Sequence, residues 1–163
     1  MERKNIFLII ILVILVALIG VGVILYEQQQ VKSHLTQANN YHSQMMAYNP
    51  QLTNATSNIK AVGIINKTKP LLTNEMNELR AANTIFASPI QKEYINDAIQ
   101  VNTDNAKEDD LIIVSSKTTN LNQLTSYKTN YDVIYKDVVT TANNRDSIVS
   151  AHPEEFGFEI VKL

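Results

Sequence analysis

The chain has 163 residues, no cysteine, and 14 Lys and Arg against 16 Asp and Glu, for a net charge of −2 with the histidines neutral. This slightly acidic balance argues against nucleic acid as a partner, and the lack of cysteine excludes disulfide bonds and thiol chemistry. No glycine occurs between Gly63 and Gly157. Because glycine serves tight turns and bulges, so long a stretch without it predicts mostly helix.

Residues 6–26 are predicted to form a transmembrane anchor. Residues 6–25 are all apolar or glycine. As a helix that rises ~1.5 Å per residue they would be ~30 Å long, which matches the hydrocarbon thickness of a bilayer. Tyr26 follows this run, at a position typical of the membrane interface. The sequence therefore predicts that residues 6–26 contact membrane lipid.

The charges near the anchor predict its orientation. Arg3 and Lys4 lie just before the apolar run. The positive-inside rule then places the tail of residues 1–5 in the cytoplasm and the rest of the chain outside the cell membrane, as a single-pass signal-anchor protein. A cleaved signal peptide is the alternative, although the apolar run is longer than such peptides usually have.

Residues 27–152 are predicted to form a helical ectodomain. Apolar residues spaced three and four apart, interrupted by polar stretches and prolines, predict three long helical arms, two of them kinked, at Pro50 and at Pro89. These arms are expected over residues 27–66, 70–104 and 110–150.

Two connections are expected between the arms. The first is Lys67–Pro70, because proline lacks the N–H that a helix interior needs. The second is the polar cluster at residues 103–110, which is typical of a turn or a solvated helix start. Short connections favour antiparallel neighbours. The predicted fold class is therefore mainly α: a transmembrane helix that continues into an extracytoplasmic antiparallel bundle of three to four long helices.

The C-terminal residues 153–163 are expected to form a tail or a short strand. Residues 156–163 begin with alternating apolar and polar side chains, as a strand would. The run at residues 111–115 is rich in β-branched side chains, which favour strands. An α+β domain in which these two segments pair is the alternative fold.

Tyr127, Tyr131 and Tyr135 recur every four residues, so a helix would place them on one face. An aromatic strip of this kind could stack on a ring-bearing ligand. The competing interpretation is that the rings pack at the edge of the bundle while the hydroxyl groups reach water. The three tyrosines are the candidate ligand-binding residues.

No metal or cofactor site is predicted. His34 and His42 lie eight residues apart rather than the four that let two helical histidines share a metal. The acidic cluster Glu108–Asp110 lacks the alternating ligands and the central glycine of a calcium loop, and a solvated helix terminus explains it better.

No catalytic residue is predicted either, and we expect the chain not to be an enzyme. Ser57–Lys60 matches a Ser-x-x-Lys nucleophile pattern, but the companion motifs of that family are missing. Asn54 and Asn66 begin glycosylation triplets. About two such triplets are expected by chance in a chain so rich in Asn, Ser and Thr, so the sequence does not decide whether either asparagine is modified.

In layout the chain resembles anchored helical-bundle families: chemoreceptor ligand-binding bundles, LemA-type envelope proteins, and phage or division proteins with one N-terminal span. The resemblance covers the plan of an anchor followed by helices and implies no functional residue. The sequence predicts an envelope protein whose ectodomain is a protein-interaction or structural module, with a protein partner or a second copy. An extracytoplasmic, sensor-like small-ligand binder is the alternative, and an enzyme without a recognisable motif is third.

Overall fold

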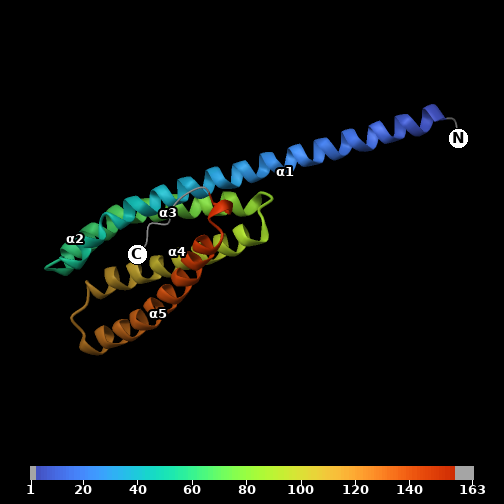
Figure 1. Ribbon diagram of the computed structural model, residues 1–163. Helices are drawn as coiled ribbons and strands as arrows, with labels where there is room; N and C mark the ends of the chain where they lie inside the picture. Colours follow the sequence, from blue (N-terminus) through green and yellow to red (C-terminus); the bar gives the residue numbers. More distant parts are fainter. Residues whose placement is uncertain (1–2, 157–163) are drawn as a thin grey trace.

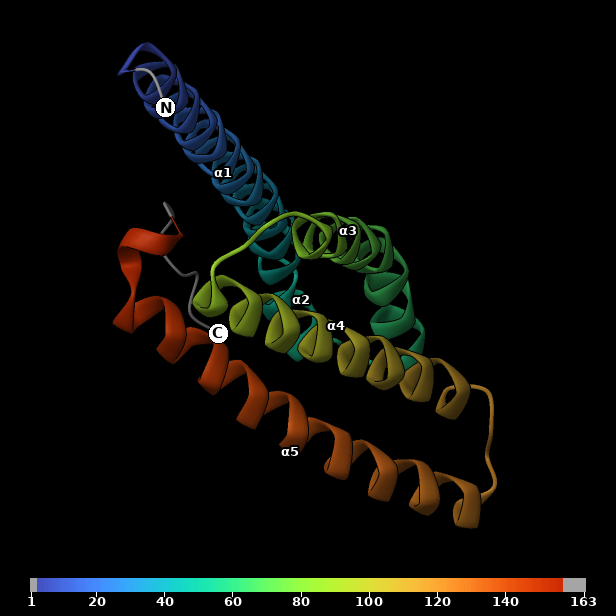
Figure 2. The same ribbon diagram turned by 90° about the vertical axis from the view of Figure 1, so that its right-hand side faces the viewer.

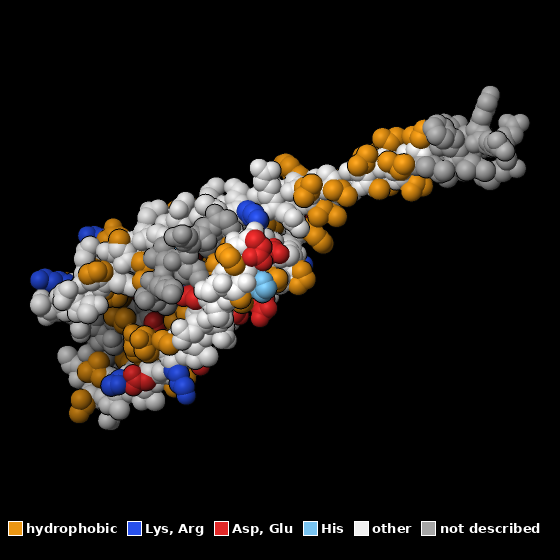
Figure 3. Space-filling view, in the orientation of Figure 1, with side chains coloured by type: hydrophobic (Ala, Val, Ile, Leu, Met, Phe, Trp, Pro, Cys, Tyr) orange, Lys and Arg blue, Asp and Glu red, His pale blue; other side chains and the backbone are white. Residues whose placement is uncertain are grey.

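The computed structural model describes residues 3–156, with side chains from residue 11 onward (Figure 1). Its longest element, helix α1 (Arg3–Met46), runs without a break from the predicted anchor into the bundle, as expected. The N-terminal half of α1 projects from the bundle, and exposed apolar side chains surround it from residue 11 to residue 26 (Figure 3). This part of α1 is long and apolar enough to cross a membrane.

Of the three residues assigned to the anchor's ends, Tyr26 is exposed beside the apolar run. Arg3 and Lys4 lie in the first turn of α1, and their side chains fall outside the described part of the structure.

Within residues 3–156, five more helical elements and the second half of α1 make up the bundle. The long helices lie side by side and alternate in direction, so that α1 packs on α3, α3 on α4, and α4 on α5 (Figures 1 and 2). This arrangement confirms a mainly α fold with antiparallel neighbours. The elements that follow α1 are α2 (Asn49–Thr53), α3 (Asn58–Thr84), α4 (Pro89–Ser115), α5 (Leu121–Ala151) and the short 3-10 helix η1 (Pro153–Glu155).

We call the end of the bundle from which the N-terminal half of α1 projects the proximal end, and the end that holds α2 the distal end. The proximal half contains the main hydrophobic core, to which α1, α3, α4 and α5 all contribute. Phe156 closes it, with its ring 4.9 Å from the ring of Tyr94. The fully buried members of this core include Val31, Leu35, Leu79, Ala82, Ile95 and Phe156.

The distal half is less tightly closed. Its apolar cluster is small, consisting of Val101, Val138 and Ala142 with the half-buried Ile134 against them. In Figure 2 the distal half of α5 lies beside α4 and away from α1. The hairpin of α1 and α3 and the hairpin of α4 and α5 therefore share a large buried core at the proximal end and only a small apolar cluster at the distal end.

The prediction of a turn at Lys67–Pro70 is wrong, because Pro70 lies inside α3. Ile65, Leu72 and Leu79 are buried on the same face of α3, on both sides of the proline. Burial of that face outweighs the single backbone hydrogen bond that proline removes, since packing rather than local propensity supplies most helix stability in proteins.

Pro50 does interrupt the first arm, as predicted, because α1 ends at Met46 and Pro50 lies in the first turn of α2. Pro89 also interrupts its arm, as predicted, but it lies in the first turn of a separate helix rather than at a kink within a continuous one. The Ser88 side chain accepts a hydrogen bond from the Gln91 N–H, and the Gln91 side chain accepts one from the Ser88 N–H. This capping box makes a firm helix start.

The prediction of a connection at residues 103–110 is also wrong, because these residues lie within α4. The chain turns at residues 116–120 instead, and the Asn120 side chain caps α5 by accepting from the Asn122 and Gln123 N–H groups. The strand alternative fails at residues 111–115, which are helical, and no strand occurs in residues 3–156. The rest of the proposed C-terminal strand, residues 157–163, lies outside the described residues.

Candidate functional site

The three candidate tyrosines lie along α5 but do not line a single cavity. Tyr131 and Tyr135 stack, with ring centroids 6.0 Å apart and an interplanar angle of 10°. Tyr127 and Tyr131 line one groove between α4 and α5, of about 310 Å³. Tyr135 lines a different cavity, which lies between the two helical hairpins. Their role in ligand binding stays a prediction.

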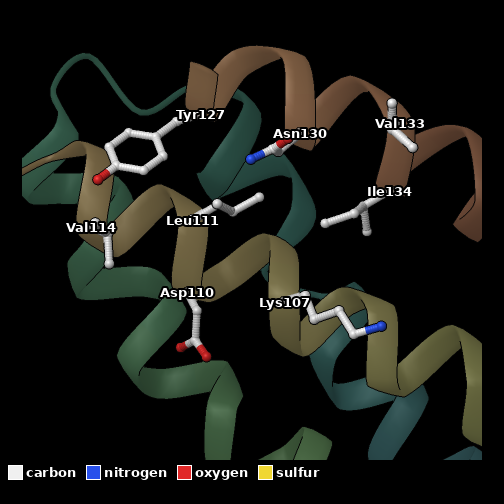
Figure 4. A pocket seen from close by; sticks show the side chains of 8 residues that line it. All are labelled: Lys107, Asp110, Leu111, Val114, Tyr127, Asn130, Val133 and Ile134. Carbon is white, nitrogen blue, oxygen red and sulfur yellow. The ribbon is translucent and has the colours of Figure 1, made fainter. Parts of the chain in front are cut away.

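A second groove lies between α4 and α5, and we call it the α4–α5 groove (Figure 4). It has a volume of about 500 Å³. Tyr127 and Val114 lie at one end and Ile134 at the other, with Leu111 between them (Figure 4). Val133 on its edge is 59% exposed and Val114 is 44% exposed. The remaining lining residues are polar: Lys107, Asp110 and Asn130.

A third opening is a cavity of about 520 Å³ at the distal end, which we call the distal cavity. It is bounded by the end of α1, by α2 and α3 on one side, and by α4 and α5 on the other. Its volume lies within the range typical of small-molecule sites. The lining combines apolar residues (Met45, Met46, Leu52, Ile64, Leu72, Val138 and Val139) with polar ones (His42, Tyr48, Asn49, Thr53, Thr68, Asn105, Glu108, Asp109, Tyr135 and Asn143).

Two adjacent carboxylates from α4 line the distal cavity. Burial, followed by repulsion from Asp109 and Asp104, raises the pKa of Glu108 to about 7. Burial also raises the pKa of Asp109 to about 6, although Lys69 opposes the shift. The Oε1 atom of Glu108 is buried and finds no hydrogen-bond partner among the described residues. Both carboxylates are therefore held in surroundings that disfavour their charge.

Asp104 shows the opposite behaviour one turn earlier on α4. Its burial would raise the pKa, but hydrogen bonds from Lys107 and Gln100, both 2.7 Å long, outweigh this effect and hold the pKa below its ordinary value. A buried carboxylate stays charged when hydrogen-bond donors surround it. Asp104 has two such donors, whereas the buried Oε1 of Glu108 has none among the described residues.

Both histidines of α1 face glutamates of α3. The His34 Nδ1 lies 2.7 Å from a carboxylate oxygen of Glu78 in a half-buried pair. The His42 Nδ1 lies 3.4 Å from a carboxylate oxygen of Glu75, and both residues are buried, at 6% and 3% exposed. The second contact lacks hydrogen-bonding geometry, so neither ring nitrogen of His42 has a hydrogen-bond partner among the described residues. His42 also lines the distal cavity.

Asn102 on α4 adds to this layer of buried polar groups. The residue is fully buried, and neither its side-chain oxygen nor its nitrogen has a hydrogen-bond partner in the described part of the chain. Buried amides are normally hydrogen-bonded, and an exception usually indicates strain, a role in function, or a bound molecule. Within residues 3–156, no group of three His, Asp or Glu side chains lies close enough together to hold a metal ion.

Sequence reasoning missed the distal cavity because its residues come from five helices and share no motif. The sequence pattern of Glu108 and Asp109 was tested only against a calcium loop, and the spacing of His42 was tested against a metal site. A usable signal was available for His42, which falls at the three-and-four spacing of the buried residues Leu35 and Ala38. A histidine on a buried stripe needs a partner, but the sequence does not show which helix supplies it.

Comparison with known protein families, curated proteins and solved structures finds no match to this chain.

Proposed function

We propose that this protein is a membrane-anchored interaction module. Helix α1 holds it in the bilayer with the N-terminus in the cytoplasm, and the bundle extends on the other side of the membrane. There the α4–α5 groove binds a second copy of the same chain. The observation that carries the proposal is the apolar lining of that groove, in which Val114 and Val133 are exposed and Leu111, Tyr127 and Ile134 are half-buried.

An exposed apolar groove of this kind is typical of a protein–protein interface. Burial of Val114 and Val133 against another helix would remove apolar surface from water, at about 25 cal/mol per Å². The rim carries one charge of each sign, Lys107 and Asp110, so that two such rims can face each other without net repulsion.

The packing of α5 favours a second copy as the occupant. Helices α3 and α4 each pack on two long helices, whereas α5 packs mainly on α4. A two-fold axis through the groove would bring the same surface of each copy together and give each α5 a second neighbour. Anchoring in a bilayer would also confine the copies and raise their effective concentration.

Disulfide cross-linking tests the interface directly, because the natural chain has no cysteine. The full-length Val133→Cys variant in membranes should form a disulfide-linked dimer under mild oxidation. Asn83→Cys, which places an exposed thiol at the end of α3, is the control and should stay monomeric. If Val133→Cys stays monomeric, or if both variants cross-link equally, the proposed interface is wrong.

A substitution in the groove provides a second test. Asn130→Cys lies on the groove and should also cross-link, and adding Val133→Asp should abolish its dimer because a carboxylate would then be buried in the interface. A partner of another kind would instead give a cross-linked species that does not have twice the mass of the chain.

The same cysteine variants test the orientation. A maleimide that does not cross membranes should label Asn83→Cys in intact cells, and the protein should stay in the membrane fraction after alkaline extraction. Labelling only after the cells are permeabilised would invert the proposed topology.

A further inference from the structure

We infer that the distal cavity binds a small organic cation, namely a primary amine with a carbon body of a few atoms. Its ammonium group would lie against Glu108 and Asp109. Its carbon body would lie against the apolar wall, which includes Met45, Leu72 and Val138. This site is separate from the α4–α5 groove and does not depend on the proposed self-association.

The charge of the lining indicates the sign of the ligand. Glu108 and Asp109 both line the cavity, and none of the described residues that line it is Lys or Arg. The buried Oε1 of Glu108 has no hydrogen-bond partner among the described residues. An ammonium group carries three donors and a positive charge, so it would satisfy this acceptor and offset the repulsion between the neighbouring carboxylates.

The raised pKa values of the two carboxylates agree with this assignment. Glu108, at about 7, and Asp109, at about 6, keep their protons more readily than ordinary carboxyl groups. The physical cause is burial without sufficient counter-charge. Asp104, which has Lys107 and Gln100 as donors, shows how a cationic donor reverses the shift on the same helix.

His42 supplies an observation that does not depend on the acidic pair. The residue is 6% exposed, lines the cavity, and has no hydrogen-bond partner for Nδ1 or Nε2 among the described residues. A buried imidazole with both nitrogens unbonded is costly unless something completes it. A bound molecule with a polar end would give such a partner to this ring.

The apolar part of the lining favours an organic cation over an inorganic one. Metal ions of the calcium and magnesium type need oxygen ligands on all sides. Here much of the wall is aliphatic or thioether side chain, and two tyrosines, Tyr48 and Tyr135, add aromatic rings that can attract a cation. A short alkylammonium ion has both the charge and the apolar surface that this lining requires.

Binding can be measured by titration calorimetry and thermal shift on the full-length protein in lipid nanodiscs. The probe is n-butylammonium, with n-butanol, butyrate and Ca²⁺ as comparison ligands. We expect saturable binding and a rise in melting temperature with n-butylammonium alone. Equal binding of butanol would show a merely apolar cavity, and binding of Ca²⁺ alone would show a metal site; either result would overturn the inference.

Variants locate the site. Glu108→Gln with Asp109→Asn should weaken n-butylammonium binding about 10- to 100-fold, as expected for loss of charge-assisted hydrogen bonds. Asp132→Asn removes an exposed carboxylate on α5 outside the cavity lining and should leave the affinity unchanged.

Val139→Trp tests the location without altering a charge. Val139 lines the cavity and is partly exposed, so a larger side chain can occupy the space at little cost to folding, and binding should be lost. Unchanged affinity in this variant and in the carboxylate variant would place the ligand elsewhere and refute the inference.

Discussion

The proximal and distal halves of the bundle are built from the same helices but are packed differently. In the proximal half α1, α3, α4 and α5 share one core, and η1 fastens its end: Lys32 donates to the Glu154 carbonyl and Gln91 to the Glu155 carbonyl. In the distal half the apolar cluster is small, and a cavity of about 520 Å³ with polar walls lies between the hairpins.

This difference means that one half of the bundle supplies most of the folding stability and the other half supplies the surfaces that can bind a ligand or partner. Where side chains fill the space between helices, the burial of apolar groups stabilises the fold. Where they do not, the structure retains a cavity, unbonded polar atoms and exposed apolar surface, all of which a ligand or partner can satisfy. The proximal half is the scaffold, and both proposed binding surfaces lie in the distal half.

The largest expected effect concerns His42 and Glu75, which lie where the two halves meet. His42→Leu would leave the Glu75 carboxylate buried without its facing imidazole. We expect the free energy of unfolding to fall by about 3–5 kcal/mol, as measured by urea unfolding followed by circular dichroism. Adding Glu75→Met should restore most of the stability, because an apolar pair of similar size needs no counter-charge. A neutral single variant would contradict this account.

A matched pair of leucines on α3 compares the two halves directly. Leu79 is buried in the proximal core, whereas Leu72, two turns earlier, is buried but lines the distal cavity. Leu79→Ala should cost about 3–4 kcal/mol, and Leu72→Ala about 1 kcal/mol less, because Leu72 already faces empty space. Equal losses in urea unfolding would indicate that the distal half is packed as tightly as the proximal half.

The distal carboxylates should make stability depend on pH. Their raised pKa values mean that the folded chain holds protons that the unfolded chain has already released. Stability should therefore fall as the pH rises from about 4 to about 7. After allowance for solvent screening, the expected loss from Glu108 is about 1–2 kcal/mol.

Glu108→Gln should flatten this decline and make the protein more stable than the natural chain at pH 8. The charged groups that act on the pair are Asp104, Asp110 and Lys69. The melting temperature recorded from pH 4 to pH 8 measures the effect, and an unchanged profile in the variant would show that Glu108 does not titrate in this range.

The smallest expected effects are at the helix caps. Ser88→Ala removes the cap of α4 and also a hydrogen bond from Ser88 Oγ to the Glu155 carboxylate, so it should cost about 1–2 kcal/mol. Asn120→Ala removes the cap of α5 at the distal end, where the side chain accepts from the N–H groups of Asn122 and Gln123 in its own helix, and should cost about 0.5–1 kcal/mol. The reverse order in thermal unfolding would mean that η1 does not stabilise the proximal end.

Part of the fold could be predicted because its signals are local. The apolar run of residues 6–25, the shortage of glycine and the helical spacing of apolar residues all predicted an N-terminal helix and a mainly α fold. The sequence also contained a signal that the helix continues through Pro70. Ile65, Leu72 and Leu79 keep a seven-residue spacing across the proline and therefore predict one continuous buried face. The polar run at residues 103–110 misled for the opposite reason, because Asp104 is polar yet buried by neighbouring helices.

The sequence by itself determined that the chain is helical and carries an apolar segment of membrane-spanning length, because hydrogen bonding within a helix and the period of its apolar face depend only on nearby residues. Only the tertiary structure decided which residues meet. It places His42 opposite Glu75, it puts Tyr127 and Tyr135 in the linings of different cavities, and it forms the distal cavity. These features depend on how the hairpin of α1 and α3 packs on the hairpin of α4 and α5. That packing results from the summed contacts of four helices, which no single segment of the sequence encodes.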